Sequence, residues 1–388
     1  MTQIEGQHIN GLVDIFKSLP EYRKNLLNVN HKLYDIVAIS VMAVIAGADG
    51  PTDIFHWADM HKEDLVKIMK LQCGIPSRDT IRRTLQAIEP SAFQKCFLGW
   101  IDAFRANNSN GKELVAIDGK TLRRSHDGKN DLGALHIVSA YSTEQGISLG
   151  QLATEEKSNE ITAIPVLLDS LVLDDAVVTI DAMGTQTKIV DQIVSKNAGY
   201  VIGVKENQKK LYQAIDLLFR TTNLEGRNVS RIIEEETSHG RQEHREYYQM
   251  TVSEDFPELS RWTGLRTVGM TVRTHVDKQG KSKTERRYFI SSERRNGKLF
   301  AGYVRGHWGI ENSLHWVMDV TFREDDSRIR ERTLADNISW IRRFAITLYK
   351  QHPAKKSMAT KRKMAAWNFS FLMELILGNQ AKPAFQAK

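Results

Sequence analysis

The stretch YVRGHWGIENSLHWVMDVTFREDDSRIR, residues 303–330, decides how the rest of the chain is interpreted. Its first part has the character of a helix, but it carries two tryptophans, two histidines and an acid where a packing helix would show an aliphatic stripe. Glu311 stands in the middle of this unusual run. We therefore expect Glu311 to belong to a functional site.

Two aspartates stand at the ends of short apolar runs elsewhere in the chain. Asp118 ends LVAID (residues 114–118) and Asp181 ends AVVTID (residues 176–181). Alone, either could start a turn or cap a helix. If the two strands are neighbours in a sheet, however, the two carboxylates come close together, which is unfavourable unless a cation lies between them. The pair therefore predicts a metal site.

Asp118, Asp181 and Glu311 together offer hard oxygen ligands, and the chain has no cysteine–histidine cluster of the zinc type. Such ligands favour Mg²⁺ or Mn²⁺. Two such ions, about 3.5–4 Å apart, form the usual apparatus for in-line displacement at phosphorus. Asp319 competes with Glu311 for the third place, because eight residues is only about 80° around a helix, and Glu311 could also be a surface residue in an ion pair.

Side chains that could bind DNA cluster around these acids in the sequence. The predicted DNA contacts are Lys120, Lys205, Asn207, Gln208, Arg305, His307, Trp308, Asn312 and His315. Basic and amide side chains contact phosphates and base edges, and tryptophan can stack on an unpaired base. The same residues could instead be a solvated helix start and buried tryptophans, so these assignments are hypotheses.

The order of apolar, alternating and polar segments predicts a mixed α/β fold. We expect a helical N-terminal domain (residues 1–105) that either packs or contacts DNA, and an α/β core that starts at residues 111–225. A β-rich insertion (residues 226–294) follows, and then the closing helices of the core (residues 295–350). A basic linker, KKSMATKRK, and a C-terminal helix would complete the chain (residues 351–388).

Composition sets wider limits on the class of protein. The 388 residues are 41% hydrophobic and 26% charged, which is ordinary for a globular protein. The net charge of +7 fits a nucleic-acid partner without demanding one. Two cysteines make no disulfide framework, and neither a signal peptide nor a stretch of membrane-spanning length is visible. We expect a cytoplasmic protein without a membrane partner.

Several motifs, in order, resemble those of the ISAs1-type transposases, which include the H-repeat-associated proteins. They are AIDGKTLRRS, LHIVSAYS, LGQLATEEKSNEITAIPVLL, TIDAMGTQ, YVIGVKENQ and HWGIENSLHWVMDVTFREDDSRIR, and GADG with GIPSRDTIRR nearer the N-terminus. The resemblance spans roughly residues 10–350. It implies a ribonuclease-H-like DDE domain with a mixed sheet, helices and a β-rich insertion before the third acid.

Carried over by motif, Asp118, Asp181 and Glu311 are the first, second and third acids. The resemblance also implies two Mg²⁺ or Mn²⁺ ions, double-stranded DNA (element ends and target) as partner, a dimer on DNA, and a nucleoid-associated location in a bacterial cytoplasm. The chain departs from a related signature, because His307 stands where that signature has Arg and Met318 where it has Lys. Arg305 and His315 are the candidates for those roles.

The predicted function is metal-dependent nicking of DNA at an element end, followed by attack of the freed 3′-hydroxyl on target DNA. No covalent protein intermediate is needed. Three alternatives stay open at this point: a nuclease of the same fold that does not join strands, a DNA-binding relic without catalysis, and a metal-free hydrolase that uses paired carboxylates.

Overall fold

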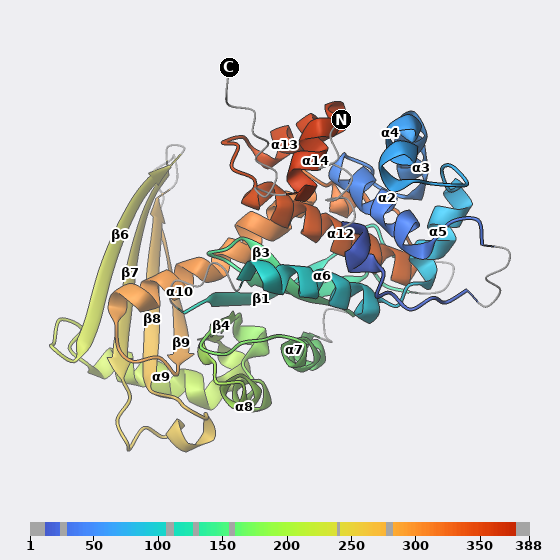
Figure 1. Cartoon of the computed structure of the whole chain (residues 1–388). Coiled ribbons are helices and arrows are strands. Elements are labelled where there is room, and N and C mark those ends of the chain that lie inside the picture. The colour runs from blue at the N-terminus through green and yellow to red at the C-terminus, as the bar shows by residue number, and fades with distance from the viewer. Residues whose placement is uncertain are drawn as a thin grey trace.

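The fold is seen in a computed structural model of the chain (Figure 1). It describes residues 12–23, 29–105, 112–126, 132–154, 160–238, 241–276 and 282–377. Strands β6–β9 form one end of the molecule, at the left of Figure 1, and helices α2–α5 lie at the opposite end. The central strands lie between these two ends.

The described strands form one mixed sheet in the order β3-β2-β1-β4-β5-β9-β8-β7-β6. Their bounds are β1 Leu114–Thr121, β2 His136–Ser142, β3 Ile147–Thr154, β4 Val177–Ile180, β5 Gly199–Val204, β6 Val229–Ser238, β7 Arg241–Thr251, β8 Thr267–Val276 and β9 Ser282–Ser291. β1, β4 and β5 run parallel, and every other pairing is antiparallel. The expected mixed α/β architecture is therefore confirmed.

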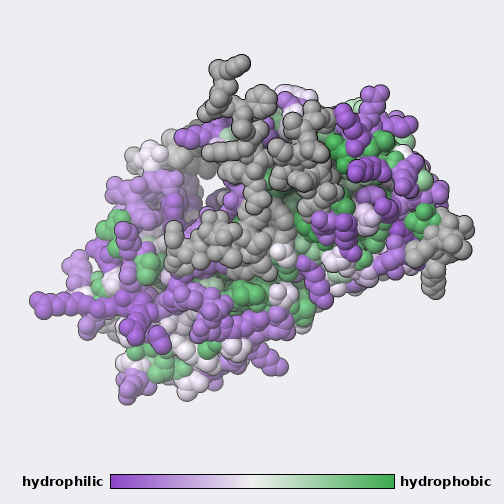
Figure 2. Space-filling model, in the orientation of Figure 1, coloured by the Kyte–Doolittle hydropathy of each residue, from purple (hydrophilic) through white to green (hydrophobic). Residues whose placement is uncertain are grey.

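The strands expected between residues 228 and 292 do not form a sheet of their own. They appear as β6–β9, and β9 pairs with β5, so they continue the central sheet. Figure 2 shows that hydrophilic residues dominate the visible surface over this end of the molecule. This end of the sheet therefore presents a polar face to solvent.

Helices cover both faces of the sheet. Their bounds are α2 Leu33–Ile45, α3 Pro51–Met60, α4 Lys62–Met69, α5 Arg78–Ala87, α6 Pro90–Arg105, α7 Glu160–Asp169, α8 Thr187–Ser195, α9 Lys209–Thr221, α10 Gly297–Ile310, α11 Trp316–Val320, α12 Arg332–Gln351, α13 Met358–Trp367 and α14 Phe369–Leu377. Alternate residues of β1 separate the two faces. Val115 and Ile117 pack with α7–α9, whereas Leu114 packs with α10 and Ala116 with the core around α12.

One hydrophobic core joins the helices from the two ends of the chain. α2 is buried almost all round, as expected for a helix without a polar face. Its residues share a cluster with Trp340 and Phe344 of α12 and with Leu372 of α14. The N-terminal helices therefore pack directly against the C-terminal ones. None of the helices that the structure describes is long and apolar enough to cross a membrane.

The segment KKSMATKRK is not the basic linker that the sequence suggested, because most of it lies in helix α13. Ser357 caps this helix by accepting a hydrogen bond from the Thr360 amide. Lys361 is buried, and its ammonium group donates to the carbonyl oxygens of Tyr349 and His352. Capping and this buried contact stabilise a helix that the charged composition alone did not indicate.

Candidate active site

The first two acids leave neighbouring parallel strands at the same level. Ile117 of β1 lies opposite Ile180 of β4, so Asp118 and Asp181 follow a paired position. Asp181 comes directly after β4 and accepts a hydrogen bond from the Met183 amide at 2.9 Å. The expectation that these two strands are neighbours is confirmed.

Asp118, however, does not end its strand. β1 continues to Thr121, because its other neighbour, β2, pairs with it as far as Thr121 opposite His136. The apolar run ends at Ile117, but the strand continues. The change from apolar to polar residues therefore marks a change in the surroundings of the side chains and not the end of the strand. By alternation, Asp118 projects from the same face as Leu114 and Ala116, the face covered by α10 and α12.

Glu311 stands where the regular winding of its helix changes. α10 ends at Ile310, and residues Glu311–His315 form a π-helical segment before α11. Such π-helical segments are rare in proteins, and those that occur are often found at functional sites. Glu311 is exposed, and His315 is buried with its Nδ1 3.4 Å from Oδ2 of Asp118. The segment therefore brings a histidine to the first acid while the glutamate faces open space.

His307 is the second histidine near the candidate acids. Its Nδ1 is 3.1 Å from the Thr179 hydroxyl oxygen, on β4. Burial lowers the pKa of His307, and the charges of Asp118, Asp181 and Glu311 act in the opposite direction. His307 also lines the same cleft as Asp181 and Glu311.

Asp118 is largely enclosed, with a side chain that is 21% exposed. Burial by itself raises the pKa of this carboxyl group, but the hydrogen bond and charge of His315, with the charge of His307, lower the pKa below its usual value. The carboxylate form of Asp118 is thus favoured by its histidine neighbours.

A cleft of about 580 Å³ opens beside these acids. Asp181, His307 and Glu311 line it, together with Lys205 and Arg287 at its rim. Asp118 is not among its lining residues and lies behind them, against His315. The cleft therefore has two of the three candidate acids at its wall, and basic groups that can meet a phosphate.

The chemistry of the three acids suits a hard divalent cation, because carboxylate oxygens are its preferred ligands. Within the described part of the chain, no group of three or more histidine, cysteine, aspartate or glutamate side chains is arranged to hold a metal ion. The carboxylate of Asp118 is turned toward His315. The donor types fit Mg²⁺ or Mn²⁺.

Asp319, the competitor for the third place, faces a different partner. Its carboxylate lies 2.7 Å from Nζ of Lys120, which also lies 3.1 Å from Asp325 and 3.3 Å from Glu324. Lys120 is only 8% exposed. Its charge is thus compensated by three acids inside the protein, and its contact with DNA stays a prediction.

The segment after β5 supports the loop that follows Asp181. Asn207 donates to the Ala182 carbonyl oxygen at 2.7 Å, and Gln208 donates to that of Thr185 at 2.8 Å. These amides hold the chain next to the second acid, whereas Lys205 remains exposed at the cleft. Of these three residues, only Lys205 lines the cleft. Among the described residues, its ammonium group makes no hydrogen bond of this kind.

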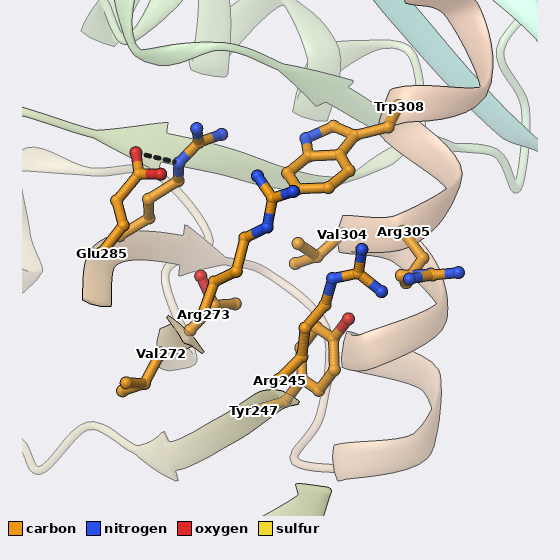
Figure 3. Close-up of a pocket in the computed structure, with 10 residues that line it drawn as sticks. Arg245, Tyr247, Val272, Arg273, Glu285, Val304, Arg305 and Trp308 are labelled. Carbon is orange, nitrogen blue, oxygen red and sulfur yellow. Dashed lines mark hydrogen bonds and ion pairs between the residues drawn. The ribbon is translucent and has the colours of Figure 1, made fainter. Parts of the chain in front are cut away.

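Trp308 forms the centre of a cluster that the sequence did not predict (Figure 3). The guanidinium groups of Arg245, Arg273 and Arg287 lie 5.6, 5.3 and 5.5 Å from its ring. These arginines come from β7, β8 and β9, and Arg245 lies opposite Arg273 in the sheet. Arginines on one face of adjacent strands were the available signal, but the strand register was needed to bring them together.

The other predicted contacts are more dispersed. Arg305 lies beside the Trp308 cluster, 3.4 Å from Glu236 and 3.9 Å from Glu234. Asn312 is exposed in the π-helical segment next to Glu311. Both therefore lie on the helix that carries the third acid, and their contact with DNA stays a prediction.

Comparisons with known proteins agree with one another. Residues 109–348 match the family model "Transposase DDE domain", and residues 13–101 match the model "DDE_Tnp_1-associated". "Putative transposase YncI" of Escherichia coli O157:H7 is 40% identical over 372 residues, which are 95% of each chain. "H repeat-associated putative transposase YhhI" of Escherichia coli strain K12 is 36% identical over 373 residues, 95% of this chain and 98% of that protein.

Among solved structures, a piggyBac transposase synaptic complex with hairpin DNA aligns with 99% of this chain and 81% of its own. The TM-score is 0.40 and the sequence identity 12%.

Proposed function

The chain belongs to the DDE transposase family, and from this premise we propose that it nicks DNA at the end of a mobile element and joins the freed 3′-hydroxyl to target DNA. The observation that carries the proposal is geometric: Asp118 and Asp181 follow a paired position of β1 and β4, and Asp181 and Glu311 line one cleft. They come from two paired strands and one helix that are far apart in the sequence. Such an arrangement suits a ribonuclease-H-like DDE centre.

In this proposal Asp118, Asp181 and Glu311 would hold Mg²⁺ or Mn²⁺. When bound, such ions lower the pKa of the attacking oxygen and stabilise the charge on the leaving oxygen at phosphorus. The role of the protein is then mainly positioning and electrostatics, and no Ser, Tyr or Cys nucleophile is required.

The surrounding residues have supporting roles. His315 holds the carboxylate of Asp118, and His307 contacts the Thr179 hydroxyl and lines the cleft with Asp181 and Glu311. Lys205 and Arg287 at the rim of the cleft would bind phosphate oxygens of the DNA. A DNA duplex at this cleft would place a phosphodiester within reach of Asp181 and Glu311.

The test is cleavage of DNA that spans the element end, with Mg²⁺, Mn²⁺, Ca²⁺ or EDTA. We expect wild-type nicking with Mg²⁺ or Mn²⁺ only, and a loss of roughly 10²–10³-fold in Glu311→Gln, the scale of losing one electrostatic group at a reacting centre. Glu254→Gln is the matched control, because Glu254 is exposed and away from the cleft. Nicking that persists in Glu311→Gln would assign the third place to Asp319.

A nuclease that does not join strands is the second candidate. It shares the same acids, so cleavage alone does not separate the two. Strand joining by a labelled oligonucleotide with a free 3′-hydroxyl does, because only the transposase gives a larger labelled product. Binding without cleavage under any metal would instead indicate an inactive relic, and cleavage in EDTA a metal-free hydrolase.

A further inference from the structure

A basic groove lies apart from the cleft, where the N-terminal helices meet the segment before α12. It measures about 370 Å³ and is lined by Arg78 and Arg82 of α5 and by Arg330. Asp79 and Glu331 also line it. Residues far apart in the sequence thus gather three guanidinium groups at one hollow.

The acids near this groove are largely occupied within the protein. Glu331 caps α12, where its carboxylate accepts hydrogen bonds from the amides of Thr333 and Leu334. Asp79 is 3.5 Å from Arg82 and 3.9 Å from Arg78, and its side chain is 51% exposed. One loosely held carboxylate does not balance three arginines.

In the loop between α11 and α12, too, the acidic side chains are engaged within the protein while basic side chains are exposed. Its acids face inward or pair with arginines nearby: Asp325 lies 3.2 Å from Arg123, and Asp326 lies 3.0 Å from Arg323. Arg328 and Arg330 are exposed, and within the described part of the chain neither pairs with an acidic group. Ile329 between them is half-buried, 3.9 Å from the position of a Cβ on Gly50.

This loop also connects the groove with the candidate active site. Asp325 contacts Lys120, which lies two residues after Asp118 on β1. Arg123 and Arg124 follow at the end of the strand and are 82% and 54% exposed. Basic residues therefore continue from the first acid, over the loop, to α5.

We propose that Arg78, Arg82, Arg328 and Arg330, here called the arginine surface, bind the backbone phosphates of double-stranded DNA outside the cleaved position. Guanidinium groups bind phosphate oxygens with two parallel hydrogen bonds. The charge of the arginine surface is available, since its acidic neighbours are few and engaged. The inference rests on the proposed function for the identity of the partner, and it assigns the N-terminal helices a direct part in binding.

The test compares the full chain with a variant in which all four arginines are Gln. Binding of a duplex of about 30 base pairs is followed by fluorescence anisotropy over a series of salt concentrations. Each lost phosphate contact lowers the slope of log K against log salt by about 0.9. We expect a slope smaller by roughly 3–4 and an affinity at least ~10-fold weaker at moderate salt.

The control variant changes Arg220, Arg227, Arg261 and Arg294 to Gln, which removes the same charge from exposed positions outside the cleft and the groove. Its slope should stay near the wild-type value. Thermal unfolding of both variants checks that the fold is intact. Equal slopes for the arginine-surface variant and the control would overturn the proposal.

The outcome is separable from that of the proposed function. A reduced slope with no cleavage by any form of the protein would support the arginine surface and refute the transposase activity. Wild-type cleavage with an unchanged slope in the arginine-surface variant would do the reverse.

Discussion

The carboxylate of Glu324 lies 3.3 Å from the ammonium group of Lys120, and both side chains are buried. The same carboxylate is 3.6 Å from Arg343 and accepts a hydrogen bond from Ser339 at 2.7 Å, both on α12. This single acid therefore ties the strand that carries Asp118 to the long C-terminal helix.

Glu324→Gln should destabilise the protein strongly. The change leaves buried cations without their counter-charge, which typically costs about 3–5 kcal/mol. Urea unfolding at neutral pH measures this loss in the free energy of unfolding. Asp326→Asn is the control from the same turn, since Asp326 is 44% exposed and its ion pairs are worth at most about 1 kcal/mol. Similar losses in the two variants would contradict a special role for Glu324.

The difference in stability between wild type and Glu324→Gln should depend on pH in a definite direction. Burial by itself raises the pKa of Glu324, but Arg343, Lys120 and Arg342 lower it to about 2. A carboxyl group with a lowered folded-state pKa stabilises the fold above its unfolded value, here 4.5, and loses this contribution as the pH falls. The gap between wild type and Glu324→Gln should therefore narrow below about pH 4.5.

Asp336 on α12 should show the opposite pH dependence. Burial raises its pKa to about 6, although Gln151 donates a hydrogen bond to it. Because the folded state then holds the proton more tightly than the unfolded state, stability falls as the pH rises from about 4 to 6. A rise of this size in the pKa of one carboxyl group changes the free energy of unfolding by at most about 3 kcal/mol.

Asp336→Asn removes this titration. The stability of the variant minus that of wild type should increase by about 1–3 kcal/mol between pH 4.5 and pH 7. Urea unfolding at several pH values measures the difference, and any constant effect of the amide cancels in the comparison. A difference that does not change with pH would show that Asp336 titrates normally.

Gly119→Ala should disturb the first acid without touching it. An added methyl group at Gly119 would meet the side chains of Glu160 and His136, a buried pair whose Oε1 and Nε2 lie 2.6 Å apart. Overpacking of this kind typically costs about 1–3 kcal/mol. Because Asp118 is the preceding residue, we also expect nicking to fall by about 10–100-fold.

Gly302→Ala is the control for this change. Gly302 lies in α10 with open space around the position of an added methyl group, and alanine favours a helix by about 0.5–1 kcal/mol. Nicking should then be unchanged. A Gly119→Ala protein with wild-type stability and activity would show that the buried pair gives way without cost.

Trp308→Ala should weaken binding of the DNA end. The ring contacts three arginines, which also pair with Glu236, Glu243 and Glu285, and each cation–π contact is worth roughly 0.5–1 kcal/mol or more. We expect about 10-fold weaker binding in the Mg²⁺-free protein, measured by anisotropy, with partial recovery in Trp308→Phe. Trp316→Ala is the control, since Trp316 is 58% exposed on the next helix.

Local patterns were sufficient for most of the sheet and for the neighbouring positions of Asp118 and Asp181. Apolar runs such as VVTI and GYVIGV have the length and composition of buried strands, and they occur as β4 and β5. The helical nature of the Glu311 region was equally visible. The π-helical segment was not visible in the sequence; within it Leu314 and His315 are buried, and His315 lies beside the first acid.

The contacts between distant segments were beyond local reasoning. Nothing near Lys120 in the sequence indicates Glu324 or Asp319 as its partners. The α13 helix was missed for a similar reason, since its charged residues suggested solvent while Lys361 in fact meets two carbonyl groups. Each miss concerns a charged side chain that meets its partners inside the protein.

The shared core of α2 with α12 and α14 has a consequence for the synthesis of the protein. A ribosome completes α2 at Ile45 long before it begins α12 at Arg332. Until then an almost wholly apolar helix lacks the surface that buries it, and exposed surface of this kind promotes aggregation and attracts chaperones and proteases. A gene truncated between Glu311 and α12 would therefore yield a short-lived product, even though all three acids had already been translated.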